Sequence, residues 1–245
     1  MREIVFNKRR IKLYDNIDEL PIVRFHKYNK YYLIDSCLGS DVSDIDYHLK
    51  RAIGYINSNK ELAITELENI RRGLHLINET ISAKHMAYAV LVTEIDGERR
   101  DDLSDEGIKK TIEILNDIPK GWLDRLMESV KKKIDDDISA YFPSQFDDAR
   151  QKEALEYIHK RTGVILDGII KEDIDYSTIR DIDNFLLTFV SPKKFFGDSN
   201  AEVIYDKQFG EMNILLKNEL GLDYKTMSVL EYYTSFEYLK KIRKK

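Results

Sequence analysis

Glu156 and His159 are the residues whose spacing comes closest to that of a known metal site. Their Glu-x-x-His pattern occurs in carboxylate-bridged di-iron centres, which need the motif twice and two further glutamates on facing helices. The remaining histidines lack an acidic residue three positions before them: His26, His48, His75 and His85. We therefore expect no metal site, and we interpret Glu156 and His159 as a polar pair on a helix surface.

A run of charges offers a second possible site, because Lys131-Lys-Lys is followed by Asp135-Asp-Asp. Each lysine precedes an aspartate by four residues, so opposite charges are neighbours on the surface of one helix. The three aspartates are consecutive and project in different directions, so they cannot converge on one cation. The pattern predicts a solvated face with ion pairs between Lys131 and Asp135 and between the two pairs that follow.

The short motifs that commonly accompany catalysis are absent from this sequence. It contains no His-Glu-x-x-His, no glycine-rich phosphate loop and no Gly-x-Ser-x-Gly nucleophile elbow. A Ser-His-Asp triad stays open, because its members meet only in the folded chain. We expect a protein that is not an enzyme and has no cofactor, and we keep an enzyme with an unrecognised site as the third of three functional classes.

Charge is distributed unevenly along the 245 residues, whose net charge is −5. The first twelve residues carry +4 and the last six carry +5, which leaves −14 for the middle of the chain. The two basic ends are either solvated tails or contact sites. As contact sites they comprise Arg9, Arg10, Lys240, Lys241, Arg243, Lys244 and Lys245. A base-reading motif is missing, so we expect no sequence-specific DNA binding, whereas non-specific phosphate contact stays open.

Cysteine content and hydropathy indicate the compartment. The one cysteine, Cys37, excludes an internal disulfide, and we interpret it as a small buried apolar residue. The first ten residues lack the apolar core of a signal peptide, and no window approaches about 18 uncharged apolar residues. We expect a protein of a reducing compartment that is neither secreted nor embedded in a membrane.

The helices expected to position these residues start from a hairpin over residues 42–77. Two apolar stripes at helical spacing run over 42–56 and 63–77, and the polar break at Ser58-Asn59 separates them. Two striped helices with a short link predict an antiparallel helical hairpin. We expect Leu67, Ile70 and Leu74 to be buried against the first of the two helices.

Capping and periodicity predict further helices along the chain. They begin near Pro21, Ser82, Ser104, Pro119, Asp147, Ser177, Tyr205 and Ser228. Gly39 and Gly221 are expected just after the last apolar residues of two of these helices. The helix from Pro119 should end before Pro143, and its apolar stripe comprises Leu123, Met127, Val130, Ile134 and Tyr141. We predict helix for the β-branched run at 89–95 as well, with a short strand as the competing interpretation. Residues 4–13 form either a short strand or an extended arm. Within the helix of 147–169, we expect the buried face to be Leu155, Ile158, Thr162, Ile165 and Ile169.

Two aromatic features suggest contacts with other molecules. Phe195 and Phe196 lie in the longest irregular stretch, residues 191–200, and we expect them to contact another subunit or another ring. Tyrosines cluster at 28, 31 and 32 and again at 232, 233 and 238. Adjacent tyrosines on a helix cannot face the same core, so these rings lie either at an interface or in a partly exposed core.

Several stretches resemble structural proteins of tailed bacteriophages. They are Glu19-Leu-Pro-Ile-Val-Arg-Phe-His-Lys-Tyr-Asn-Lys-Tyr, Gly39-Ser-Asp-Val-Ser-Asp, Lys131-Lys-Lys-Ile-Asp with Tyr141-Phe-Pro, and Met227-Ser-Val-Leu-Glu-Tyr-Tyr with Phe236-Glu-Tyr-Leu. Together they are similar to the ring proteins in the neck and tail of crAss-like phages. This resemblance implies a virion component of the portal–neck–tail assembly that lines the DNA channel, made in the host cytoplasm.

The resemblance also implies partners. The partners would be copies of the chain in a twelve-fold ring, the portal protein and adjoining tail rings, with possible non-specific contact to channel DNA. The helical patterns themselves predict an all-α fold, a multi-helix bundle built on antiparallel helical hairpins with an extended N-terminal arm. A head-to-tail adaptor would suit such a chain. We expect one mainly helical domain over 1–245, with a basic arm at 1–14, an irregular loop at 191–200 and a basic tail at 240–245. The alternative is a chaperone or scaffold for tail or capsid assembly, itself absent from the virion.

Overall fold

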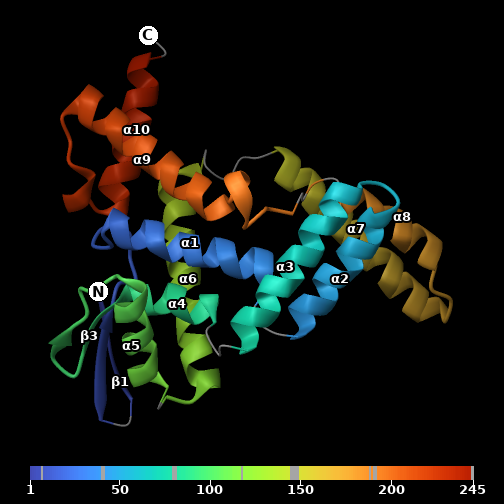
Figure 1. Ribbon diagram of the computed structural model, residues 1–245, viewed down its shortest axis with the longest axis horizontal. Coiled ribbons are helices and arrows are strands. Elements are labelled where there is room, and N and C mark those ends of the chain that lie inside the picture. Colours follow the sequence, from blue (N-terminus) through green and yellow to red (C-terminus); the bar gives the residue numbers. More distant parts are fainter. Residues whose placement is uncertain are drawn as a thin grey trace.

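The computed structural model describes residues 1–6, 8–39, 42–78, 82–116, 118–143, 149–187, 189 and 192–243 (Figure 1). Its strands are β1 (Arg2–Phe6), β2 (Arg9–Leu13), β3 (Val92–Ile95) and β4 (Glu98–Arg99). Its α-helices are α1 (Ile22–Leu38), α2 (Val42–Ile56), α3 (Lys60–Asn78), α4 (Ala83–Leu91), α5 (Asp105–Leu115), α6 (Lys120–Tyr141), α7 (Ala149–Lys171), α8 (Tyr176–Leu186), α9 (Ala201–Leu220) and α10 (Val229–Arg243). Short 3₁₀ helices occur at η2 (Gly197–Ser199) and η3 (Tyr224–Thr226).

The fold is mostly helical, and the prediction of an all-α protein is wrong because the chain also forms a sheet. Four antiparallel strands lie in the order β1-β2-β3-β4. The basic N-terminal residues form the hairpin of β1 and β2, so the strand interpretation is confirmed and the extended arm is not. Side chains alternate between the two sides of β2, which explains how this strand packs on the core. Ile11 and Leu13 are buried, while the ammonium of Lys12 between them lies 2.9 Å from the Glu94 carboxylate.

The prediction of a helix through residues 89–95 is also wrong, because the chain changes from α4 to β3 at Val92. The buried Arg24 of α1 lies at this change. Its guanidinium donates to the carbonyls of Val90 and Val92 at 2.7 and 3.1 Å, and to that of Arg100 at 2.6 Å. Carbonyls at a helix end lose their intrahelical partners, and Arg24 supplies donors in their place.

The main core lies where α1, α4, α6 and α10 meet the sheet. The apolar stripe predicted for α6 is confirmed at its centre, where Met127, Val130 and Ile134 are buried. The helix ends at Tyr141, before Pro143, as expected. Of the two interpretations of the tyrosine clusters, the core one holds for Tyr28, Tyr31 and Tyr232, which are buried, whereas Tyr238 is exposed.

Several predicted helix ends are confirmed by the backbone. Gly39 and Gly221 follow α1 and α9 with positive φ of 76° and 68°, which glycine adopts without strain. The side chain of Ser104 caps α5. Helix α8 begins slightly earlier than expected, because Asp175 rather than Ser177 is its N-cap. The expected start of α7 at residues 147–148 lies outside the described residues.

The remaining helices form a second region of the molecule. Figure 1 shows α2, α3, α7 and α8 gathered at the end opposite the sheet, with α1 running between the two regions. Both termini lie on the side of the sheet and α10. A small second core, made by Leu38, Phe195 and Ala201, joins the end of α1 to the start of α9. The second region therefore has little core of its own within the chain.

Candidate interaction surfaces

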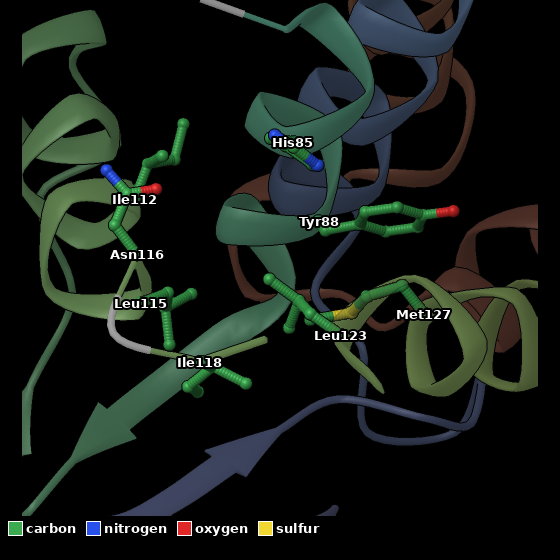
Figure 2. Close-up of a pocket in the computed structure, with 8 residues that line it drawn as sticks. All are labelled: His85, Tyr88, Ile112, Leu115, Asn116, Ile118, Leu123 and Met127. Carbon is green, nitrogen blue, oxygen red and sulfur yellow. The ribbon is translucent and has the colours of Figure 1, made fainter. Parts of the chain in front are cut away.

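A cavity beside His85 is too small for a substrate. Figure 2 shows it between α4, α5 and α6, lined mainly by apolar side chains such as Ile112, Leu115 and Met127. Its volume of about 30 Å³ suffices for one or two water molecules, far below the several hundred Å³ of small-molecule sites. His85 is its only imidazole, with Nε2 3.7 Å from the Asp124 carboxylate.

A second hollow of about 160 Å³ lies beside His26. The His26 ring stacks on Phe209 and Tyr205 of α9, with ring centroids 3.9 and 4.5 Å apart. Its Nε2 lies 3.0 Å from the Asp206 carboxylate. Burial lowers the pKa of this imidazole below its usual value, although Asp206 opposes the shift. His26 joins α1 to α9, and this structural role accounts for all of its contacts.

The residues first considered for metal or charge chemistry are not assembled into a site. Glu156 and His159 are both exposed on α7. Among the described residues, no group of three or more potential ligands is placed to hold a metal ion. The predicted ion pair between Lys131 and Asp135 is confirmed. Lys133 departs from the prediction, because its ammonium lies 2.9 Å from Asp15 rather than pairing along the helix.

Arg9 and Arg10 are paired within the sheet. The Arg10 Nε lies 3.0 Å from the Glu3 carboxylate, and its backbone N–H donates to Asp96 at 2.7 Å. The guanidinium of Arg9 lies 3.7 Å from the same aspartate. Three cations of the arm, Arg9, Arg10 and Lys12, thus have acidic partners in their own chain. The contact of Arg9 and Arg10 with another molecule stays a prediction.

Phe195 and Phe196 differ in their surroundings. The Phe195 side chain is 0% exposed and packs against Leu38 and Ala201, so our expectation that it contacts another subunit is wrong. The loop holds it there because Asn69 donates to the Lys193 carbonyl at 3.0 Å. Phe196 is exposed, and its contact with another subunit stays a prediction.

The basic C-terminal residues continue a helix. Lys240, Lys241 and Arg243 form the last turn of α10, so the expected tail starts later than residue 240. Their positive charges suit the negative end of the helix dipole. The Arg243 guanidinium also lies 2.8 Å from Glu219 of α9. Lys244 and Lys245 lie outside the described residues.

The α2–α3 hairpin forms as predicted, and Ala52 and Ala63 of its two apolar stripes are buried, but most of the larger apolar residues are not. Charged side chains lie inside it: Glu66 of α3 is fully buried, 2.9 Å from His48 Nδ1 and 2.8 Å from Arg51 Nε. The expected core residues Leu67 and Leu74 are instead exposed, and Ile70 is half-buried. The physical reason is that the buried charges attract one another and draw the helices together along the polar sides.

The exposed side of this hairpin carries large apolar residues, which we call the α2–α3 face. It comprises Val42, Leu49, Ile53 and Ile56 of α2 with Leu67 and Leu74 of α3. Val42 is the most exposed of these, at 74%. Contiguous exposed apolar residues on helices mark sites of contact far more often than they mark solvated surface.

Helix α7 likewise turns its apolar residues outward. Leu155, Ile158, Leu166 and Ile169 are exposed, and we call them the α7 stripe. The predicted burial of Leu155, Ile158 and Ile169 is therefore wrong; Thr162 is exposed too, and Ile165 is half-buried. A different side of α7 packs on α8, through Tyr157 against Phe185 and through Arg161, 2.6 Å from Asp183.

The sequence contains a pattern that indicates the buried side of the α2–α3 hairpin. His48, Arg51, Ala52 and Tyr55 repeat at spacings of three, one and three, as a helix face does. This polar face lies beside the apolar stripe, and only the apolar stripe was assigned to the core. A glutamate opposite a histidine and an arginine could have identified the buried side.

Comparisons with family models, curated proteins and solved structures give no match to this chain. No helix of the described residues has both the length and the apolar character needed to cross a membrane. Function must therefore be argued from the surfaces described above.

Proposed function

We propose that this protein is a structural subunit of a phage particle that assembles into a ring of the portal–neck–tail region. In this role it is a head-to-tail adaptor that contributes to the DNA channel and contacts the portal protein and adjoining rings. The proposal rests on the resemblance of the segments near residues 19–31, 131–143 and 227–239 to ring proteins of crAss-like phages.

The observation that carries the proposal furthest is the apolar surface of the second region. The α2–α3 face and the α7 stripe place large aliphatic side chains on the outside of helices that have little core between them. Subunits of stable assemblies expose such surfaces when isolated and bury them against neighbours. A structural subunit needs these surfaces and needs no catalytic pocket.

An assembly chaperone that stays outside the particle is the second candidate. Exposed apolar helix faces favour it too, because they could cover the same kind of face on another viral protein until assembly. The two candidates differ in where the protein ends up. A structural subunit stays in the finished particle, and a chaperone leaves it.

Quantitative mass spectrometry of purified virions tests the proposal. We expect the chain in a fixed, whole-number ratio to the portal protein, retained after density-gradient purification. Absence from particles, together with abundance in infected cells, would favour the chaperone. Labelling with an antibody fragment in electron micrographs should then place the protein at the neck or tail, rather than over the capsid surface.

A further inference from the structure

The two exposed apolar surfaces of the second region are built on matching repeats. On α2, Val42 and Ile53 stand eleven residues apart, and on α7 the same spacing separates Leu155 from Leu166 and Ile158 from Ile169. Eleven residues make three helical turns, about 16 Å of helix. Residues at this spacing lie on the same side of a helix, so the two surfaces offer apolar side chains at matching intervals along their helices.

The apolar residues of α2 and α3 lie on one side of their hairpin. Leu49 and Ile56 each follow a buried residue by one position, His48 and Tyr55, and Leu67 follows Glu66 in the same way. On both helices, therefore, the exposed apolar residues are rotated about the helix axis in the same direction from the residues that contact the other helix. In antiparallel helices, equal rotation from the contact brings the two stripes to the same side, so they form one continuous face.

The α7 stripe of the same chain is not placed to cover this face. The end of α8 contacts α2, where the Tyr55 hydroxyl donates to the Leu187 carbonyl at 2.9 Å. Gly54 approaches the Leu187 side chain on the same side of α2. This is the side of α2 away from Leu49 and Ile53, and the side chains of both surfaces are exposed, so neither surface covers the other within the chain.

Exposed charges of opposite sign lie beside the two surfaces, together with Lys152 of α7 and the Asp46–Lys50 pair of α2. Lys60 and Arg71 border the α2–α3 face on α3, eleven residues apart. Glu156 and Asp167 border the α7 stripe, also eleven residues apart, and all four side chains are exposed. Two cations about 16 Å apart therefore match two carboxylates about 16 Å apart. Arg71 has a partner on its own helix, Glu68 at 2.7 Å. Because this ion pair is at the surface, Arg71 can exchange Glu68 for a carboxylate of another copy.

We propose that copies of this chain associate head to tail, with the α7 stripe of one copy packed on the α2–α3 face of the next. The occupant of each face is thus a second copy of the chain, selected by matched apolar repeats and opposite charge. Two different surfaces make a heterologous contact, which closes into a ring or continues as a filament. The inference identifies the contact within the ring of the proposed function, and in that respect it rests on that proposal.

Sedimentation of the purified full chain tests the contact with two single variants. Leu67→Glu places a charge in the α2–α3 face, and Leu155→Glu places one in the α7 stripe. We expect wild-type protein to self-associate with rising concentration, and each variant to lose at least about tenfold in association constant, because a charge buried without a partner is costly. Val5→Glu is the matched control: Val5 is exposed in β1, outside both surfaces, and should associate like wild type.

Mixing the two variants separates a heterologous contact from a symmetric one. Each variant keeps one intact surface, so the mixture should form one-to-one dimers and stop there. Charge reversal gives an independent check: Lys60→Glu with Arg71→Glu, or Glu156→Lys with Asp167→Lys, should weaken association. Mixing these two double variants should restore association, with the two variants alternating, because every contact between unlike copies then pairs opposite charges. Circular dichroism confirms that each variant keeps its helices.

Three results would overturn the inference. They are a wild-type chain that stays monomeric, a Leu155→Glu variant that still associates like wild type, and a mixture that forms no dimer although both variants are folded. The virion measurement is separate from these. A chain found in particles but monomeric in solution rejects this contact and leaves the proposed function standing.

Discussion

Glu66 shows how a single buried charge sets the polarity of an element. Its carboxylate is fully buried between α2 and α3, where it meets both His48 and Arg51. A buried carboxylate is costly unless cations and donors surround it, so these three residues must lie together inside the hairpin. The apolar residues beside them are then turned to the outside. One ion cluster thus determines which surface of the hairpin is available to a partner.

The first residue-scale prediction is that Glu66→Ala unfolds more readily than wild type by about 3–5 kcal/mol. The loss follows because Arg51 stays buried without its counter-charge and His48 without its partner at Nδ1. Urea unfolding followed by circular dichroism measures it. Glu68→Ala is the control on the same helix, since Glu68 pairs with the exposed Arg71 and should cost less than about 1 kcal/mol. Equal losses in the two variants would show that the cluster contributes no more than a surface pair.

Among the secondary-structure elements, the sequence predicts helix ends correctly where the capping residues are close to one another in the chain. The capping box before α10 is present: the Ser228 N–H donates to Glu231 at 2.8 Å, and the Glu231 N–H donates to the Ser228 hydroxyl at 3.2 Å. The end of α4 was misread, since donors from Arg24, far away in the sequence, stabilise the change to a strand. A cap can be predicted from the sequence when its residues lie within four positions of the helix end, whereas this long-range cap cannot.

The prediction at this scale concerns the same capping box. Ser228→Ala removes the acceptor for the Glu231 N–H, and we expect a loss of about 1 kcal/mol in the free energy of unfolding. Chemical denaturation monitored by circular dichroism gives the value. Ser235→Ala provides the comparison, because the Ser235 hydroxyl only donates to a carbonyl within α10 and should matter less. A Ser228→Ala variant as stable as wild type would mean that packing of α10 alone fixes its start.

The whole molecule consists of a well-packed region around the sheet and a thinner helical region that exposes apolar surface. The first region contains almost the entire core and includes both basic ends. The cations of the N-terminal hairpin are largely paired there, whereas Lys240 and Lys241 project from the end of α10. The C-terminal turn is therefore the better candidate for contact with an acidic neighbour or with DNA.

The prediction at this scale is that removing residues 240–245 weakens assembly with the neighbouring ring or portal. The effect should be largest at low salt, because exposed charges are screened over about 10 Å at 0.1 M and less far as salt rises. Co-sedimentation with the partner over a salt series measures it. Removal also breaks the pair of Arg243 with Glu219, so Arg243→Ala serves as the control for that local contact. Assembly at low salt that is unaffected by the deletion would leave this turn as a solvated helix end.

The sequence by itself determined the local features of this protein. Helical periodicity, caps and glycines located most of the helices, the hairpin at residues 42–77, the end of α6 and the turn before α10, because each depends on residues within a few positions of one another. It also indicated that catalytic motifs are missing. The basic ends and the loop with Phe195 were recognised as distinct segments, but their surroundings were not.

Tertiary structure alone decided the features that depend on distant partners. Strand β2 joins the sheet by pairing with Val92–Ile95, far away in the sequence, and burial of Phe195 required Leu38 and Ala201. The faces of α2, α3 and α7 were misassigned for the same physical reason. Periodicity shows that an apolar stripe exists. Whether the stripe packs on the chain's own core or faces solvent depends on the other sides of the helix, because ion pairs or aromatic contacts there can fix the orientation of the helix.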